Sequence, residues 1–209
     1  MSEEVSATLA SGPGEVHAAK ALVGGLRLPA DKSVAQRALL FNAMAHGEAA
    51  VTMPRPGEDV LSMTGVLRTL GAVTDVETIP GGLTRVHLRG GGSASAAVLP
   101  GRGGEELDCG NAGTAMRLLI GALAGRPAAA TLIGDASLSS RPMERVAAPL
   151  RAIGARVVTE DGHAPVMVAG SRSLAATAHE LPVASAQVIG ALTLAGLAAK
   201  GTTTITVPG

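Results

Sequence analysis

One pattern recurs three times along the chain, and it limits the folds that the sequence can adopt. In each copy a helix rich in small residues ends and the chain enters a strand, over residues 43–52, 122–131 and 196–205. The first two copies start at residues 43 and 122, a spacing of 79, and a second phrase repeats between Leu67–Val73 and Leu150–Arg156 at a spacing of 83. Because a period near 80 exceeds that of ordinary solenoid repeats, we expect large βαβαββ units packed around a shared core.

The composition supports a compact α/β (α+β) fold with an aliphatic core. Hydrophobic residues make up 46% of the chain and charged residues 16%, so extensive disorder is not expected. The 17 basic and 17 acidic side chains balance, and Phe41 is the only Phe, Tyr or Trp. A general nucleic-acid surface needs positive charge and stacking side chains, so we expect no nucleic-acid partner.

The sequence also indicates where such a chain resides. No stretch is long and apolar enough to cross a membrane, and the acidic start is unlike a signal peptide. Cys109 is the only cysteine, which excludes an intrachain disulfide, and we interpret it as a small residue at a strand end rather than a nucleophile. The five histidines lack metal-ligand spacing. These observations predict a cytoplasmic protein with no membrane partner.

The segment from Leu28 to Leu40 predicts an anion site at the start of a helix. A proline ends an extended stretch, and a helix is expected from Asp31 to Ala45, with Ser33 and Gln36 spaced as a capping box. Lys32 and Arg37 flank the free N–H groups of the first turn, where the helix dipole also favours negative charge. Taken alone, an ordinary capped surface helix with two solvated cations explains the same residues.

The other repeats open their helices in a similar way. The second copy has Asn111, Gly113 and Thr114 at this point, and the third has Ser185, Ala186 and Gln187. If the repeats are related by rotation, three helix starts point toward one place, and Arg117 and Arg141 add positive charge there. We infer a site for an anionic small molecule.

The remaining elements follow from periodicity and turn residues. Helices are expected at 58–70, 111–124, 141–153 and 185–199, with an apolar stripe of Val60, Leu61, Met63, Leu67 and Leu70 on the first of these. Strands are expected at 15–19, 22–28, near 51, at 73–77, 84–88, 105–108, 129–133, 157, 166–168 and 202–207. The Gly-rich run 90–104 lacks a Gly-Lys-Ser/Thr ending, so we interpret it as a surface loop and not as a Walker phosphate loop.

Four ordered motifs resemble the EPSP synthase family (5-enolpyruvylshikimate-3-phosphate synthases). Residues 29–40 resemble its first signature, with Ala30 where the usual form has glycine. The second, third and fourth resemblances fall on 110–118, 134–143 and 181–187. Together they span about 22–209. The related UDP-N-acetylglucosamine enolpyruvyl transferases share the repeat fold but usually lack this Asp-Lys-Ser…Arg opening.

The resemblance implies a reaction and a set of ligand-binding residues. The reaction is transfer of the enolpyruvyl group from phosphoenolpyruvate to the 5-hydroxyl of shikimate 3-phosphate, with release of phosphate and with no metal or organic cofactor. The expected shikimate 3-phosphate residues are Lys32, Ser33, Arg37, Thr114, Ser185, Ala186 and Gln187. The expected phosphoenolpyruvate residues are Lys32, Asn111, Gly113, Arg141 and Gln187, and Lys32 is the catalytic candidate because it serves both ligands. Ala186 stands where some variants have serine, so a side-chain contact to the phosphate is missing there.

The resemblance also implies a domain plan. Residues 1–20 form a lead-in segment that would belong to a second domain, and 21–209 form the first domain, an inverse half-barrel of three repeats around a helical core. The second domain, which carries the family's acidic catalytic residues, is absent from this sequence. Asp31, Asp135 and Glu144 are expected in helix-end and surface roles instead. We therefore expect a partner, either that second domain or a complementary chain, and no turnover by this chain alone.

Two alternatives to a transferase half remain open on the sequence. One is a non-catalytic anion-binding domain. The other is a transferase of the same fold that acts on a nucleotide sugar.

Overall fold

The computed structural model describes residues 28–93, 98–126, 128–171 and 173–208. The strand expected at 15–19 lies outside these residues, as does the strand expected at 22–28 except for Leu28, which is not in a strand.

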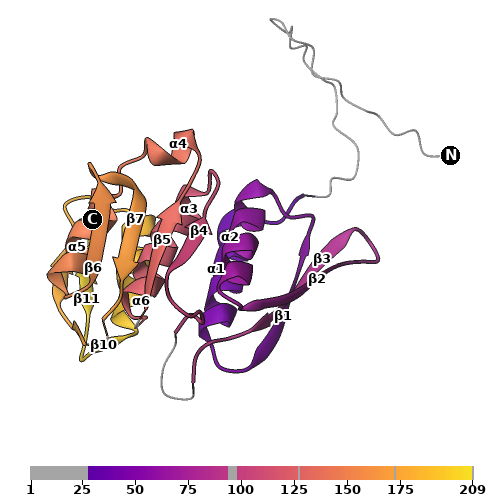
Figure 1. Cartoon of the computed structure of the whole chain (residues 1–209), viewed down its shortest axis with the longest axis horizontal. Helices are drawn as coiled ribbons and strands as arrows, with labels where there is room; N and C mark the ends of the chain where they lie inside the picture. Colours follow the sequence, from indigo (N-terminus) through magenta and orange to yellow (C-terminus); the bar gives the residue numbers. More distant parts are fainter. Residues whose placement is uncertain (1–27, 94–97, 127, 172, 209) are drawn as a thin grey trace, which may run out of the picture.

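The first unit is a three-stranded antiparallel sheet packed against two helices (Figure 1). Its elements are α1 (Lys32–Met44), β1 (Glu48–Pro54), α2 (Glu58–Thr69), β2 (Val73–Ile79) and β3 (Leu83–Arg89). The strand order is β1-β3-β2, so the strand after α1 pairs with the last strand of the unit. Gly71 ends α2 with a positive φ of 82°, a conformation that glycine adopts without steric cost.

The second unit repeats this arrangement in a four-stranded sheet. Its elements are β4 (Glu105–Asp108), α3 (Gly113–Ala124), β5 (Ala129–Ile133), α4 (Ala136–Ser139), α5 (Glu144–Ala152), β6 (Arg156–Glu160) and β7 (His163–Ala169). The strand order is β4-β5-β7-β6, with β4 parallel to β5 and the other pairs antiparallel. The β5-β7-β6 order corresponds to β1-β3-β2, so the period read from the sequence is a structural repeat.

A third set of elements repeats the opening of the second. It comprises β8 (Leu174–Ala175), β9 (Ala178–Glu180), α6 (Ala186–Gly196), β10 (Ala199–Lys200) and β11 (Thr204–Thr206). The strands on either side of α6, β9 and β11, pair in parallel, as β4 and β5 do on either side of α3. The mixed α/β class expected from the sequence is confirmed, whereas the short strands β8, β9 and β10 were not predicted.

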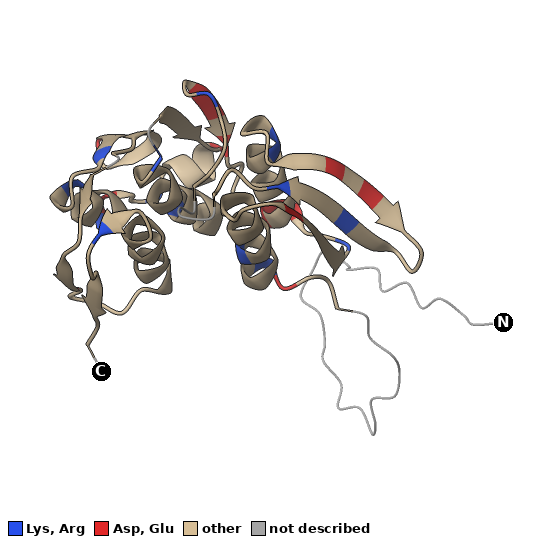
Figure 2. Cartoon of the chain, turned by 90° about the horizontal axis from the view of Figure 1, so that it is seen from below, with Lys and Arg blue, Asp and Glu red and all other residues tan. Residues whose placement is uncertain are grey.

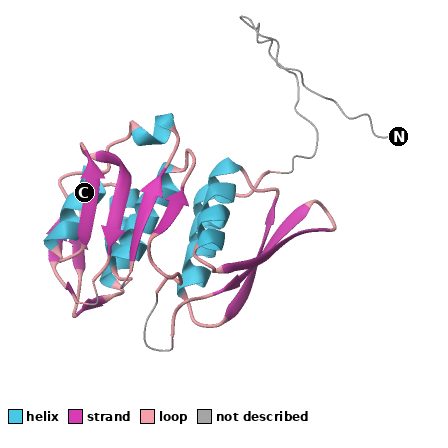
Figure 3. Cartoon of the chain, in the orientation of Figure 1, coloured by secondary structure: helices cyan, strands magenta, loops and turns pink. Residues whose placement is uncertain are grey.

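Helix α1 packs on α2, and α3 packs on α5 and α6, within one continuous aliphatic core, whereas the short α4 lies apart at the edge (Figure 3). Helix α3 is its most buried member, with ten of its twelve residues buried. Helix α6 packs directly on α3, since an ideal Cβ built on Gly121 would lie 2.2 Å from the carbonyl oxygen of Ala191. Backbones come this close only where side chains are small, so the Ala- and Gly-rich composition allows the two helices to touch.

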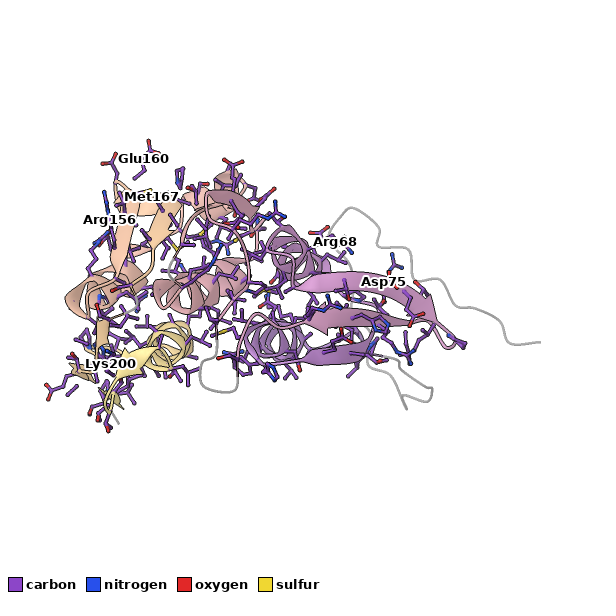
Figure 4. All side chains as sticks on the ribbon, turned by 60° about the horizontal axis from the view of Figure 1, so that its bottom comes forward. Arg68, Asp75, Arg156, Glu160, Met167 and Lys200 are labelled. Atoms are coloured by element: carbon purple, nitrogen blue, oxygen red, sulfur yellow. The ribbon has the colours of Figure 1, made fainter. Side chains whose placement is uncertain are left out.

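Charged residues lie mostly at the surface, with one exception. Figure 2 shows Lys and Arg spread along the molecule with Asp and Glu between them, and in Figure 4 Arg156 and Glu160 lie at the outer edge of the second unit. Arg126, just after α3, is only 2% exposed and donates from Nη2 to both carboxylate oxygens of Glu105 at 3.0 Å. This buried ion pair joins the carboxyl end of α3 to the start of β4.

Three sequence expectations about helices are wrong in detail. Ser33 and Gln36 do not form a capping box: Asp31 caps α1 by accepting from the Val34 amide at 2.8 Å, and Gln36 points into the core. The helix begins at Lys32, so Asp31 occupies the N-cap position and its charged carboxylate accepts from an amide of the first turn, while Ser33 lies inside that turn. On α2, Leu61 is 53% exposed, and the buried stripe uses Val66 instead.

The third error concerns the helix expected at 141–153, which begins at Glu144. The preceding residues are held in another conformation by specific hydrogen bonds. Met143 donates its amide to the carbonyl of Gly162 at 2.7 Å, and the carbonyl of Pro142 accepts from Arg117 at 3.1 Å. Arg141 and Pro142 therefore lie in the connection between α4 and α5.

Candidate anion-binding site

The candidate site is built around the start of α3. Gly113 is the first residue of this helix and is buried, and no side chain caps the helix start. An ideal Cβ on Gly113 would lie 3.0 Å from Nη1 of Arg141 and 3.2 Å from Nη1 of Arg117. Two guanidinium groups thus reach the helix start, next to a residue without a side chain. Free N–H groups, the helix dipole and two cations together favour a negatively charged ligand.

Arg141 is held in place by the residues that precede α3. Its Nη2 donates to the side-chain oxygen of Asn111 and to Oγ of Ser137, the latter at 3.2 Å. The Asn111 side-chain amide in turn donates to Asp135 at 2.8 Å. Asp135 also caps α4 by accepting from the Leu138 amide at 2.7 Å. The hydrogen bond from the Leu138 amide lowers the pKa of the Asp135 carboxyl most, and the hydrogen bonds from Asn111 and the Ser137 amide and the charge of Arg141 lower it further.

Arg117 connects three segments of the chain. Its Nη1 donates to Oε1 of Gln187 on α6 at 2.9 Å, and its Nη2 donates to the carbonyl of Pro142 before α5. Gln187 completes the link by donating from Nε2 to Oγ1 of Thr114 at 3.0 Å. The side chains that open α3 and α6 are therefore joined across the contact between these helices.

The electrostatic environment of Arg117 favours a negatively charged neighbour. Burial lowers the pKa of the half-buried Arg117 guanidinium, and the charges of Arg141 and Arg145 lower it further. The charges of Arg141 and Arg145 thus disfavour the charge of Arg117, and a nearby anion would offset that repulsion.

The first unit contributes a separate pair of cations. Lys32 forms an ion pair with Asp59 on α2, with 3.0 Å between Nζ and Oδ2. Arg37 donates to the main-chain carbonyl of Ser33 at 3.1 Å. Arg37 also borders a cavity of about 230 Å³ together with Leu118 of α3 and Gly190 of α6. Helix α1 therefore faces the pair α3–α6.

The structure brings together only some of the residues expected from the sequence. Asn111, Gly113 and Arg141 form one group, and Thr114 and Gln187 form a second group with Arg117. Ser185 caps α6 by accepting from the Val188 amide at 3.5 Å, and Ala186 is the exposed first residue of that helix. Over the described residues, Lys32, Ser33 and Arg37 make no hydrogen bond or ion pair to the second or third set of elements.

Three residues at the site were not in the expected ligand set. Asp59 pairs with Lys32, and its signal in the sequence was an acidic residue in the first turn of the next helix. The charge of Arg117 is visible in the sequence. Its hydrogen bonds to Gln187 and Pro142 are not, because they join residues 70 and 25 positions apart. Arg145 lies in the first turn of α5, and nothing in the local sequence indicates that it is close to Arg117 on α3.

The remaining candidates have the structural roles expected of them. Burial raises the pKa of the Cys109 thiol to about 12, so it is not a nucleophile at neutral pH. Asp31 and Asp135 cap helices, and Glu144 forms an ion pair with Arg151. Within the described part of the chain, no cluster of three or more His, Cys, Asp or Glu side chains is placed to hold a metal ion. In the same part, no helix has the length and apolarity needed to cross a membrane.

The fold and the cation-lined helix start define the class of protein, an α/β repeat domain with a candidate anion-binding site. Comparison with known proteins identifies the family within this class. The family model described as EPSP synthase (3-phosphoshikimate 1-carboxyvinyltransferase) matches residues 16–208. The chain belongs to the EPSP synthase family.

Individual relatives give the same result and show how much of them the chain represents. The chain is 46% identical over 187 residues to the 3-phosphoshikimate 1-carboxyvinyltransferase of Acidithiobacillus ferrooxidans, covering 90% of this chain and 41% of the relative. It is 44% identical over 194 residues to that of Afipia carboxidovorans, covering 92% and 42%. The crystal structure of EPSP synthase from Acinetobacter baumannii superposes with a TM-score of 0.75 at 39% identity, covering 89% and 40%. The chain thus spans about two fifths of the length of these relatives.

Proposed function

We propose that this chain supplies the anion-binding half of an enolpyruvyl transferase site. The reaction is transfer of the enolpyruvyl group from phosphoenolpyruvate to the 5-hydroxyl of shikimate 3-phosphate, with release of phosphate. The observation that carries the proposal is that the guanidinium groups of Arg117 and Arg141 both lie beside Gly113 at the start of α3. The family match supports the choice of substrates.

The contacts suggest how the two ligands divide the site. Arg141, ordered by Asn111 beside Gly113, is suited to the phosphate or carboxylate of phosphoenolpyruvate, since a guanidinium binds such groups with two parallel hydrogen bonds. Thr114, Ser185, Ala186 and Gln187 are assigned to shikimate 3-phosphate, with Ser33 and Arg37 on the α1 side. Lys32 is assigned to both ligands because a lysine ammonium is a movable point charge on a long stem.

A domain plan follows from the same proposal. Residues 21–209 correspond to the first domain of the family and 1–20 to a lead-in that joins a second domain, either further along the same chain or in a complementary one. General acid and base groups must lie within hydrogen-bond reach of the reacting atoms, and the carboxylates described above are occupied in caps and ion pairs. The second domain is proposed to supply those groups and to close over the ligands in the cytoplasm.

Two experiments test the proposal. Calorimetry should detect shikimate 3-phosphate binding to the chain that weakens with added salt, because partly exposed charges are screened within about 8 Å at physiological ionic strength. Equal affinity for unphosphorylated shikimate would refute it. Phosphate release should be absent for the chain alone and present when a chain holding the remainder of the Acidithiobacillus ferrooxidans relative is added. Turnover by the chain alone, abolished by Lys32→Ala, would refute the division into two halves.

The two alternatives are distinguished by the same assays. A non-catalytic binding domain would bind shikimate 3-phosphate but remain inactive with the added chain. A nucleotide-sugar transferase would release phosphate with UDP-N-acetylglucosamine as the acceptor.

A further inference from the structure

The buried face of α1 carries a polar side chain that the anion site does not use directly. Gln36 is fully buried, with no exposed surface, although it lies in the same helix as Lys32 and Arg37. Its Nε2 donates to the main-chain carbonyl of Asp59 at 2.9 Å, across the contact between α1 and α2. Among the described residues its Oε1 has no hydrogen-bond partner.

An unpaired buried amide oxygen is unfavourable for folding. Such a group has left water without gaining a replacement hydrogen bond, and the loss commonly exceeds the net gain from one hydrogen bond made elsewhere on the same side chain. An apolar side chain of the same length would fill the space without this penalty. Stability alone therefore does not account for a glutamine at position 36.

The partner of Gln36 points to a functional reason. Asp59, whose carbonyl Gln36 holds, is the residue whose carboxylate forms the 3.0 Å ion pair with Lys32. Lys32 and Gln36 are four residues apart and so lie on the same face of α1, one turn from each other. Both contact the first turn of α2, one through the side chain of Asp59 and the other through its main chain.

We propose that Gln36 is a positioning residue of the anion site, which fixes the main chain of Asp59 so that its carboxylate orients the Lys32 ammonium. The proposal rests on the proposed function for the role of Lys32 in ligand binding. Lys32 is long and its side chain is 64% exposed, so without a fixed partner it would sample many rotamers. A buried hydrogen bond from Gln36 keeps that partner in one place.

The test replaces Gln36 and observes Lys32. The chain contains three lysines, Lys20, Lys32 and Lys200, so reductive methylation with ¹³C-formaldehyde gives few lysine signals in a carbon–proton NMR spectrum. Lys32→Arg assigns the signal of interest, and Asp59→Asn shows where it falls when the ion pair is absent. The substitution is Gln36→Met. The matched control is Asn42→Leu, which removes an amide of the same helix that donates to Ala38 within that helix.

We expect Gln36→Met to unfold at the same or a higher urea concentration, while its Lys32 signal moves toward the Asp59→Asn position. Shikimate 3-phosphate affinity should fall about threefold to tenfold, the usual effect of ordering one long side chain on binding. The Asn42→Leu control should leave the Lys32 signal in place. An unmoved Lys32 signal in folded Gln36→Met, or the same movement in the control, would overturn the proposal.

Two features keep the test decisive. The Lys32 signal is measured without a ligand. If the unsubstituted chain does not bind shikimate 3-phosphate, the proposed function is refuted, but the inference that Gln36 positions Lys32 is still tested by the signal. If Gln36→Met does not fold, the unsubstituted chain still provides a measurement. It contains two glutamines, Gln36 and Gln187, and the Nε2 protons of Gln36 should exchange slowly with solvent if Asp59 holds them. Fast exchange of both glutamine amides would overturn the proposal.

Discussion

Gly121→Ala is expected to separate the two helices that form the candidate site. The added methyl carbon would lie 2.2 Å from the carbonyl oxygen and 2.6 Å from Cα of Ala191, both in the backbone of α6. An ordinary contact begins near 3.4 Å, so α6 must move away from α3 by about 1 Å. A backbone cannot rotate aside as a flexible side chain can, so the whole helix has to shift.

The expected magnitudes follow from this displacement. Overpacking of this kind costs about 1–3 kcal/mol, and the better helix propensity of alanine offsets about 1 kcal/mol, which leaves a net destabilisation of about 0–2 kcal/mol. Gln187 lies one turn before Ala191, so the bonds that it makes to Arg117 and Thr114, at 2.9 and 3.0 Å, would lengthen beyond hydrogen-bond range. Loss of one such bond at about 1 kcal/mol corresponds to a roughly fivefold weaker anion affinity.

The assay is urea unfolding followed by far-UV circular dichroism, since the chain has no Trp or Tyr for fluorescence. The matched control is Gly65→Ala in α2, an exposed helical position where an added Cβ would meet nothing within 4 Å. That control should raise the free energy of unfolding by about 0.5–1 kcal/mol. If Gly121→Ala were as stable as Gly65→Ala and bound shikimate 3-phosphate equally well, the inferred contact between α3 and α6 would be wrong.

Three further predictions concern single residues. In an assembly that contains both halves, Gly113→Ala should weaken phosphoenolpyruvate and its mimic glyphosate and spare shikimate 3-phosphate, because the methyl displaces only the ends of Arg117 and Arg141; equal losses in calorimetry for all ligands would indicate a folding defect instead. Hydrogen bonds from Arg151 and Thr159 lower the pKa of Glu144 from 4.5 to about 2. The ionised carboxylate therefore contributes its full share to the free energy of unfolding above pH 4.5, and this share is lost as the pH falls toward 2. The ion pair of Glu144 and Arg151 is partly exposed, so Glu144→Gln should reduce the fall in the free energy of unfolding between pH 4.5 and 2 by about 1 kcal/mol or less. An unchanged dependence of this free energy on pH would contradict the prediction. Cys109 should resist iodoacetamide at pH 8 until urea unfolds the chain, whereas rapid labelling of the folded protein would disprove its burial.

The sequence was sufficient for the features that depend on local chemistry. The strands at 105–108 and 129–133 have the predicted bounds. These elements were predictable because alternation of apolar residues and turn residues act within a few positions. The repeat near 80 residues was also visible, because each copy reuses the same small residues between a helix and a strand.

Long-range contacts account for the errors. The start of α5 depends on the Met143–Gly162 and Arg117–Pro142 hydrogen bonds, and neither partner is near in sequence. Gln36 has the spacing of a capping box, but its side chain donates to the main-chain carbonyl of Asp59, 23 residues away. Arg117 lies on α3, whereas Arg141, which also lies beside Gly113, comes from the α4–α5 connection, so only the fold reveals that the two cations are close together.

The buried pair of Arg126 and Glu105 has a consequence for behaviour on heating. Removing charges from water becomes less unfavourable as temperature rises, while hydrophobic stabilisation per unit area levels off. The ion pair should therefore contribute a larger share of the local stability at the carboxyl end of α3 near the melting temperature than at 25 °C. The strands β8 and β10 have two residues each in a two-stranded sheet, and no buried ion pair joins them to another described residue. Thermal unfolding of this chain should begin there and reach α3 last.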